Sequence, residues 1–289
     1  MQAILRKLDS ATDNAYISRI DKQPYFYTKW HFHPELELSH IIESTGLRFV
    51  GDSIEPFTEG DLVLVGANLP HVWKNDAVYL EPDSNLCTYA QVIQFLPECF
   101  GSDFLKLKEM ENIRALFEKA KRGLRIEGET KNKAIQILSK LMEVEKGVER
   151  ITLLLSLLDL IAQSREVVYL SSENFLDSYH RFESTKINEV YEYTLSHYNQ
   201  KILMEDVADI ANMSVSNFCK FFKNRTRKTY VQFLTEVRIS FACHLLIENK
   251  KSIQQIALDC GFQNISNFNR SFRLLKKQSP LTYRKTFFG

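Results

Sequence analysis

The chain has 289 residues, which is too long for a single ordinary core and therefore predicts two domains. Hydrophobic residues make up 44% and charged residues 25%, as in a globular protein, and no run of about 18 apolar residues predicts a membrane span. The N-terminus has no apolar signal segment, and the five scattered cysteines form no CxxC pair. These features argue against a disulfide framework or a cysteine zinc site, and we expect a cytoplasmic protein.

The net charge of +1 hides an asymmetry along the chain. Residues 183–289 carry 16 Lys and Arg against 9 Asp and Glu, a net charge of +7, whereas residues 1–182 carry 21 against 27, a net charge of −6. A basic C-terminal part favours a polyanionic partner, and nucleic acid is the commonest. Charge alone leaves a chance distribution of surface residues as an equal alternative.

Residues 15–95 have the pattern of β structure. Short runs of Val, Ile, Phe and Tyr are separated by turn signals at Ser44-Thr45-Gly46, Gly51-Asp52, Glu59-Gly60-Asp61 and Glu81-Pro82-Asp83. Short strands at this regular spacing predict a sandwich or a barrel.

From Ser102 onward the hydrophobic period becomes helical. One helix buries Ile113 and Leu116, a second buries Leu138 and Leu141, and a third runs over residues 149–163. The third helix is apolar on more than one face, so it is buried on two sides, either wholly within its domain or partly against a second subunit. A dimer is the favoured alternative because dimers are the commonest oligomers. The polar, aperiodic residues 171–184 predict a linker.

The remaining residues contain a predicted helix-turn-helix unit. Leu203, Val207 and Ile210 lie at helical spacing and the helix ends near Asn212. Ser214 then offers an N-cap for a second helix that places Phe218, Phe221 and Phe222 on one face. A long helix follows, with Phe233, Val237, Phe241, Leu245 and Leu246 facing inward.

The same pattern recurs farther along the chain. Ser252 caps a helix, Cys260-Gly261-Phe262 makes the turn, and the next helix carries Phe268 and Phe272 inward. The segments VADIANMSVSNFCKFFK and IALDCGFQNISNFNRSFR align, and Ser-Asn-Phe opens the second helix of each. One helix-turn-helix pattern is a weak signal, but a tandem pair joined by a long helix is a strong one.

Residues 185–289 resemble the DNA-binding domain of the AraC/XylS family of transcriptional regulators. The resemblance lies in Ile256-Ala257, Gly261-Phe262, Asn267-Phe268, Phe272, Pro280 and Tyr283-Arg284, and in Arg238, Ala242 and Leu245-Leu246 of the connecting helix. Arg227 and Lys277 stand where the family has glycine after each recognition helix. A non-glycine residue in a left-handed C-terminal cap costs on the order of 1 kcal/mol, which affects the local turn geometry and not the fold.

Helix geometry predicts which side chains face DNA. With the phenylalanines inward, the candidate base-contacting residues are Ser216, Asn217, Cys219, Lys220, Ser266, Asn267, Asn269 and Arg270. The resemblance selects six of these, leaving Asn217 and Asn267 aside. The candidate phosphate-contacting residues are Lys223, Arg225, Arg273, Lys276 and Lys277. For any single outward polar residue, an ordinary solvated surface position is as good an explanation as a DNA contact. Arg270 is the strongest candidate, because arginine can donate two bonds to guanine.

The N-terminal part carries two histidine-containing clusters. His31, His33 and Glu37 are separated by even numbers of residues, so on a single strand they share a face, and His71 follows a Gly-Asp turn and a proline. Three imidazoles and one carboxylate can hold a divalent first-row metal. This pattern resembles the cupin fold and the cupin-like sensory domain of AraC-family regulators, which more often holds an organic effector.

Three interpretations of these clusters stay open. The favoured one is an effector pocket formed by Trp30, His31, His33, Glu37, His71 and Trp73. The second is a metal site on His31, His33, Glu37 and His71. In the third, the residues are structural, as buried histidines and tryptophans often are. No cofactor is required by the first or the third.

The predicted fold class is therefore α+β with two domains, an N-terminal cupin-like β-barrel plus helices and a C-terminal all-α tandem helix-turn-helix domain. We expect an effector-binding barrel over 1–100, a helical packing and dimerisation region over 101–170, a linker over 171–184 and the DNA-binding domain over 185–289.

The predicted function is sequence-specific DNA binding by an effector-responsive activator of nearby genes, and not an enzyme. Expected partners are duplex DNA, a small molecule such as a carbohydrate, a second copy of the chain and RNA polymerase, with no membrane. Two alternatives remain. A cupin isomerase or dioxygenase with a helical tail accounts for the histidines but not for the tandem repeat. A constitutive DNA-binding protein needs no effector.

Overall fold

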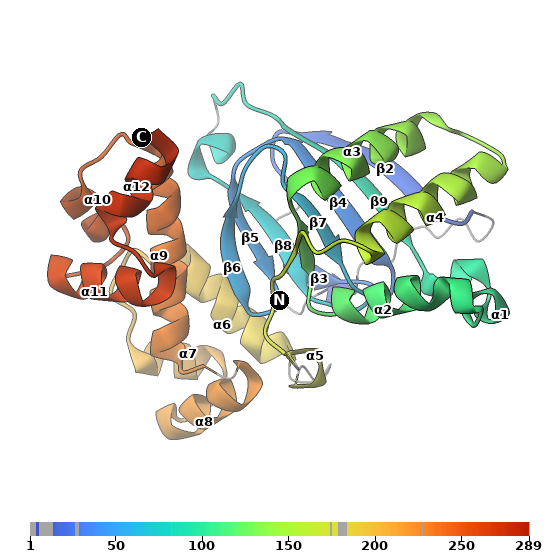
Figure 1. Cartoon of the computed structure of the whole chain (residues 1–289). Helices are drawn as coiled ribbons and strands as arrows, with labels where there is room; N and C mark the ends of the chain where they lie inside the picture. Colours follow the sequence, from blue (N-terminus) through green and yellow to red (C-terminus); the bar gives the residue numbers. More distant parts are fainter. Residues whose placement is uncertain are drawn as a thin grey trace. The chain divides into compact units, whose positions relative to one another are not determined.

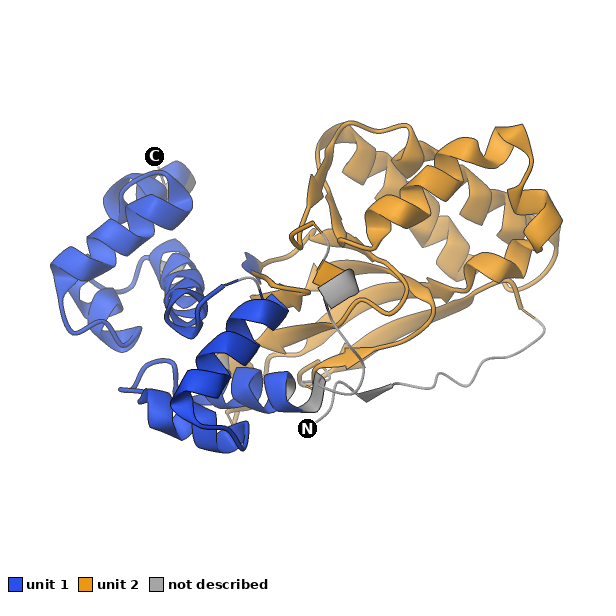
Figure 2. Cartoon of the chain, turned by 90° about the horizontal axis from the view of Figure 1, so that it is seen from below, with its two compact units in different colours: residues 1–3, 54–56, 177–289 blue, residues 4–53, 57–176 orange. Residues whose placement is uncertain are grey.

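The computed structural model describes residues 4–5, 14–26, 29–81, 83–173, 175–178, 184–226 and 228–288 (Figure 1). The chain divides into two compact units (Figure 2). The N-terminal unit consists of residues 4–53 and 57–176, and the C-terminal unit contains residues 177–289 together with the short piece 54–56. The architecture is thus α+β, with the sheets in the first unit and helices in the second.

The N-terminal unit contains two sheets. The five-stranded sheet has the order β1 (Ile4–Leu5), β3 (His31–Phe32), β8 (His71–Asn75), β5 (Gly46–Val50) and β6 (Ser53–Phe57). The six-stranded sheet has the order β11 (Val167–Tyr169), β10 (Leu124–Ile126), β7 (Leu62–Val65), β4 (Leu36–Glu43), β9 (Thr88–Phe95) and β2 (Ile17–Gln23). Among the described residues neither sheet closes on itself, so the predicted β structure is confirmed and a closed barrel is not.

The turn between β5 and β6 has the residues that the sequence predicts. Gly51 has a φ of +58°, in the left-handed region that favours glycine. A Cβ atom at this position would also lie 2.6 Å from Cβ of Ser171, so the chain packs closely here. Both constraints select glycine at position 51.

Helices cover the six-stranded sheet. They are α1 (Ser102–Leu105), α2 (Glu111–Ala120), α3 (Gly128–Glu143) and α4 (Val148–Ala162), with short 3₁₀ turns at Ala77–Leu80, Pro97–Phe100 and Lys108–Met110. One hydrophobic core joins Leu36 and Ile93 of the sheet to Leu116, Leu138 and Leu158 of the helices. The predicted helical period is confirmed, although β10 and β11 interrupt it. Sequence periodicity did not predict these three-residue strands because they are too short to show alternation.

The packing of helix α4 explains why its sequence is apolar on more than one face. Leu154, Leu157, Leu158 and Ile161 are buried against the core, while Leu153, Leu155 and Leu160 are partly buried at its margin. Val148 and Ile151 at its N-terminal end are 74% and 40% exposed. Most of the apolar surface of α4 is therefore buried within the N-terminal unit.

A buried ion pair lies within the N-terminal unit. Arg48 on β5 is only 1% exposed, and its guanidinium donates to the carboxylate of Asp61, next to β7. Burial of a charge is unfavourable unless an opposite charge and hydrogen bonds compensate for it. We therefore expect that replacing either Arg48 or Asp61 alone destabilises the N-terminal unit.

From residue 184 onward, the described part of the C-terminal unit consists of helices joined by short turns. Its helices are α6 (Ser184–His197), α7 (Met204–Ile210), α8 (Val215–Thr226), α9 (Tyr230–Glu248), α10 (Ile253–Asp259), α11 (Ile265–Lys276) and α12 (Pro280–Phe288). The short helix α5 (Phe175–Ser178) falls in the predicted linker, and residues 174 and 179–183 of that segment lie outside the described residues. Aromatic side chains dominate both ends of the unit, with Phe222 and Phe233 centred 5.5 Å apart at one end and Phe268 and Phe272 5.7 Å apart at the other.

Candidate nucleic-acid interface and ligand cavity

The first helix-turn-helix unit is formed by α7 and α8. Helix α7 ends at Ile210, and Asn212 has a φ of +53°, a conformation that asparagine tolerates better than most residues. The N–H of Met213 donates to the carbonyl of Ala208 at 2.9 Å, which closes the turn. The N–H of Asn217 then donates to Oγ of Ser214 at 3.5 Å, so Ser214 stands at the predicted N-cap of α8.

The second unit, formed by α10 and α11, repeats this turn. Gly261 has a φ of +78° at the position of Asn212, and the N–H of Phe262 donates to the carbonyl of Ala257 at 2.9 Å. The N-cap of α11 is Asn264, whose Oδ1 accepts from the N–H of Ser266 at 2.7 Å. The one extra residue of the second copy is therefore Gln263, between the turn and the cap.

Arg238 of the connecting helix α9 links the segment between α6 and α7 to the turn of the second helix-turn-helix unit. Its Nε donates to the carbonyl of Tyr198 at 2.7 Å, its Nη2 donates to the carbonyl of Gln200 at 2.8 Å, and its guanidinium lies 5.8 Å from the ring centre of Phe262. A Cβ atom on Gly261 would approach the same Tyr198 oxygen to 2.5 Å. Only glycine fits this close approach.

Each second helix has an aromatic inner face and a polar outer face. Phe218, Phe222, Phe268 and Phe272 are fully buried, and Phe221 is half-buried. Most of the residues predicted to contact bases are exposed: Ser216, Asn217, Cys219, Lys220, Ser266, Asn267 and Arg270; Asn269 is half-buried. Nη2 of Arg270 lies 3.3 Å from Oδ1 of Asn267, at the surface. The outward orientation that helix geometry predicts is thus present on both helices.

The residues predicted to contact phosphate lie around the ends of the same two helices. Lys223, Arg273 and Lys277 are exposed, while Arg225 and Lys276 are half-buried. Lys277 has a φ of +57° and its N–H donates to the carbonyl of Arg273 at 2.9 Å, so the left-handed cap forms without glycine. The other departure from the family pattern, Arg227, lies outside the described residues.

Replacing Lys277 with glycine is expected to stabilise the C-terminal unit by about 0.5–1 kcal/mol, because a left-handed conformation strains a residue with a Cβ atom. Thermal unfolding followed by circular dichroism measures the change. Asn249, which ends α9 with a φ of +54°, is the matched control, since asparagine tolerates this conformation and its replacement by glycine should change stability less. An equal gain at both positions would show that strain is not the cause.

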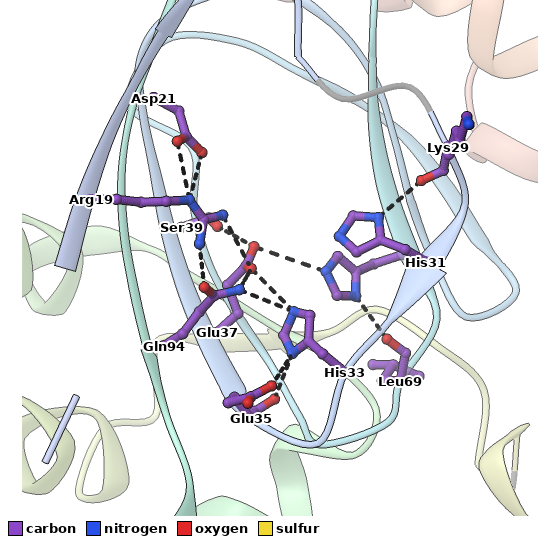
Figure 3. A network of polar contacts seen from close by, with 11 residues as sticks. Arg19, Asp21, Lys29, His31, His33, Glu35, Glu37, Ser39, Leu69 and Gln94 are labelled. Atoms are coloured by element: carbon purple, nitrogen blue, oxygen red, sulfur yellow. Dashed lines mark hydrogen bonds and ion pairs between the residues drawn. The ribbon is translucent and has the colours of Figure 1, made fainter. Parts of the chain in front are cut away.

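The histidine cluster of the N-terminal unit joins both sheets (Figure 3). His31 on β3 pairs across the sheet with His71 on β8, and His33 follows directly after β3. The prediction that His31, His33 and Glu37 share one strand is wrong, because β3 ends at Phe32 and β4, which carries Glu37, belongs to the other sheet. The bend between the strands brings the residues together nevertheless.

Backbone carbonyls orient two of the rings. Nδ1 of His31 lies 2.9 Å from the oxygen of Lys29, and Nδ1 of His71 lies 2.8 Å from the oxygen of Leu69. Each Nδ1–H therefore donates to its carbonyl. Burial, the largest effect, and the nearby imidazoles of His31 and His33 hold the pKa of His71 well below its ordinary value, against the charge of Glu37.

Glu37 is the buried negative charge of the cluster. Its carboxylate accepts from Oγ of Ser39 at 2.7 Å and from Nε2 of Gln94 at 2.5 Å, and lies 3.2 Å from Nε2 of His33 (Figure 3). Burial would raise the pKa of Glu37, but the hydrogen bond from His33 and nearby positive charges, including Arg19, lower it well below its ordinary value. Burial likewise opposes the charged form of His33, yet Glu35 and Glu37 raise the pKa of His33 to about 9.

A cavity of about 50 Å³ opens beside this cluster. Its polar lining is Arg19, Asp21, His31, Glu37 and Ser39, and its apolar lining is Phe26, Ile41, Trp73, Ala90 and Val92. Of the predicted effector-pocket residues, His31, Glu37 and Trp73 line the cavity, whereas Trp30, His33 and His71 are buried but do not line it. Arg19 and Asp21 were missed, because charged residues two apart on a strand are usually assigned to a solvent face.

Comparisons with known proteins find similarity to transcriptional regulators. A family model described as a helix-turn-helix domain matches residues 207–286. The uncharacterized HTH-type transcriptional regulator YdeC of Bacillus subtilis is 22% identical over 93% of this chain and 90% of its own. The HTH-type transcriptional activator RhaR of Mannheimia succiniciproducens is 23% identical over 94% of this chain and 91% of its own. The DNA-binding domain of AdpA, solved in complex with a target DNA, is 28% identical over 35% of this chain and 92% of that chain, with a TM-score of 0.34.

Two helix-turn-helix units joined by one long helix define a protein that binds duplex DNA. The chain is a DNA-binding transcriptional regulator, and its C-terminal unit carries a helix-turn-helix domain. The predicted class of function is thereby confirmed. Of the helices that the structure describes, none has the length and apolarity needed to cross a membrane.

Proposed function

We propose that α8 and α11 enter successive major-groove segments on one side of the DNA, about one helical turn apart. The observation that carries this proposal is the shared design of the two helices, which bury Phe218, Phe222, Phe268 and Phe272 and expose polar side chains on the opposite face. The base-contacting set is Ser216, Asn217, Cys219, Lys220, Ser266, Asn267, Asn269 and Arg270. The phosphate-contacting set is Lys223, Arg225, Arg273, Lys276 and Lys277.

The N-terminal unit would be a cupin-like sensory domain. Its cavity combines an aromatic side chain, Trp73, with the charged groups of Arg19 and Asp21, a mixture suited to a small polar molecule such as a carbohydrate. Binding of the effector would shift the population of the DNA-competent state. The similarity to the transcriptional activator RhaR over nearly the whole chain supports an activator rather than an enzyme. RNA polymerase would then be a partner of the DNA-bound protein.

The proposed domains are those expected from the sequence, 1–100, 101–170, 171–184 and 185–289. The helices of residues 101–170 would form the contact in a homodimer. Support comes from α4, whose N-terminal end exposes Val148 and Ile151 although they are large and apolar.

Selection from random duplex DNA with the purified full-length protein, repeated at two salt concentrations, tests the regulatory function. Enrichment of one asymmetric motif that spans two helical turns is the expected result. Binding that depends on salt but enriches no motif would contradict sequence-specific recognition.

Candidate sugars are then added to the DNA-binding assay and to thermal unfolding experiments, since an effector that binds the folded protein raises its melting temperature. A constitutive DNA-binding protein would show no such response.

Replacing Arg270 with alanine is expected to weaken binding to the selected motif by about 1–3 kcal/mol and to relax the preference at one base pair. The exposed guanidinium of Arg270 is the group best suited to a bidentate bond with guanine. Affinities for the motif and for its single-base variants measure the effect.

Arg273→Ala is the matched control for Arg270→Ala, because it removes the same charge from the same helix. It should weaken binding to all sequences equally and reduce the salt dependence by about one phosphate contact. Unchanged discrimination in Arg270→Ala would remove Arg270 from the base-contacting set.

A further inference from the structure

Asn267 and Arg270 contact each other on the outer face of α11. They are three positions apart, so their side chains are neighbours on the helix surface. Nη2 of Arg270 donates to Oδ1 of Asn267 at 3.3 Å, and both residues are exposed. Because arginine has donors only, the amide oxygen of Asn267, and not the amide nitrogen, faces the guanidinium. The bond therefore defines the orientation of both groups.

The first turn of α11 holds the backbone of Asn267 in place. Oδ1 of the N-cap residue Asn264 accepts from the N–H of Ser266 at 2.7 Å and from the N–H of Asn267 at 3.4 Å. Directly after Asn267, the fully buried ring of Phe268 packs in the core of the second helix-turn-helix unit. The backbone that carries the Asn267 amide is thus fixed before DNA binds.

The bond to Asn267 leaves the base-recognition chemistry of Arg270 available. It uses one of the two hydrogens on Nη2, so the other Nη2 donor and those of Nη1 remain for the two acceptor atoms of guanine in the major groove. An exposed arginine otherwise samples many rotamers, and ordering it on binding is unfavourable. A neighbour that restricts these rotamers in the free protein reduces that loss of entropy.

The matching position of α8 lacks this arrangement. Asn217 corresponds to Asn267 and Lys220 to Arg270, yet Lys220 makes no hydrogen bond within the part of the chain that the structure describes. An ammonium group is also a compact charge without the planar fork that fits guanine. Since Ser-Asn-Phe opens both helices, the arginine three positions after the asparagine is what distinguishes α11.

We infer that Asn267 is a positioning residue, which orients the guanidinium of Arg270 toward guanine. The inference rests on the proposed entry of α11 into the major groove. The contribution of Asn267 to base recognition is then made through Arg270, at the same base pair, and determines how strictly guanine is required there.

Affinities of the full-length protein for the selected motif and for its single-base variants test this role. Asn267→Ala should lower the preference about tenfold at the base pair that Arg270→Ala relaxes, which is the effect of one hydrogen bond to a charged group. Added to Arg270→Ala, the same substitution should change no preference further, because the two residues act as one unit. A loss of preference at a different base pair would overturn the inference, since Asn267 would then read a base itself.

Asn267→Asp separates orientation from a purely structural role. Aspartate keeps an acceptor oxygen for Arg270 but adds a negative charge near the phosphates, so affinity for all sequences should fall while the preference for guanine persists. Gln263→Ala is the control, because Gln263 is an exposed amide outside both proposed contact sets and its loss should change neither affinity nor preference. Melting temperatures verify that each variant folds. Equal weakening of all sequences in Asn267→Ala, with the preference intact, would show a structural role and overturn the inference.

The inference and the proposed function fail in different ways. If Arg270→Ala relaxes no base pair, the proposed contact with guanine is wrong and the positioning role is wrong with it. If Arg270→Ala relaxes one base pair and Asn267→Ala leaves that preference unchanged, only the positioning role is wrong.

Discussion

Phe272→Ala is expected to destabilise the C-terminal unit strongly and to weaken specific DNA binding. Phe272 is fully buried, and its ring centre lies 5.7 Å from that of Phe268 and 5.5 Å from that of Tyr283. Removing a buried phenylalanine ring costs about 3–5 kcal/mol, the lost burial plus the cavity left behind. Because a whole domain is stable by only about 5–15 kcal/mol, the outward face of α11 would lose its support.

The two tryptophans allow this effect to be assigned to one unit. Trp30 and Trp73 both lie in the N-terminal unit, so fluorescence reports on that unit, whereas far-ultraviolet circular dichroism is dominated by helices. Denaturation of Phe272→Ala should shift the dichroism transition and leave the fluorescence transition in place. Leu274→Ala is the control on the same helix, since Leu274 is 69% exposed and its loss should change little. Equal effects of the two substitutions would contradict the assigned core.

Arg48→Met is expected to destabilise the N-terminal unit by about 3–5 kcal/mol, because it leaves the carboxylate of Asp61 without its partner. Arg48 is almost completely buried. Methionine resembles the aliphatic part of the arginine side chain but carries no charge. The fluorescence transition of Trp30 and Trp73 should move to a lower denaturant concentration. The affinity for the selected DNA under native conditions should stay the same.

The double variant Arg48→Met with Asp61→Leu tests whether the loss comes from the unpaired charge. Replacing both partners with apolar residues should restore much of the stability, since the cost arises from leaving one buried charge alone. Lys106→Met is a further control, because Lys106 pairs with Asp103 at the surface, where side chains are 74% and 94% exposed. It should leave the transition in place. A double variant as unstable as Arg48→Met would mean that arginine packing, not charge, is what matters.

The amino-acid sequence was sufficient for most of the C-terminal unit. The inward phenylalanines, the caps at Ser214 and Ser252, and the turns at Asn212 and Gly261 are where the pattern predicts them. These features depend on local interactions, such as the helical period, side-chain caps and left-handed turn residues. The residues that specify each feature therefore lie within a few positions of it in the sequence. The same pattern occurs twice in the sequence, which strengthens the prediction of a helix-turn-helix.

The N-terminal site shows the limit of such reasoning. Even spacing predicted a shared face for His31, His33 and Glu37, but the strand breaks between them, and the cluster forms because two sheets converge. Arg19 on β2 could not be assigned to the cavity from sequence, since a charged residue on an edge strand is usually solvated.

By itself, then, the sequence determined the helix-turn-helix repeat, its caps and its outward polar faces, because short-range interactions specify them. Only the tertiary structure decided that His31, His33 and His71 come together and that Arg19 reaches the cavity. The physical reason is that pairings between strands far apart in the chain depend on the packing of the whole unit, for which no local pattern of residues provides a signal.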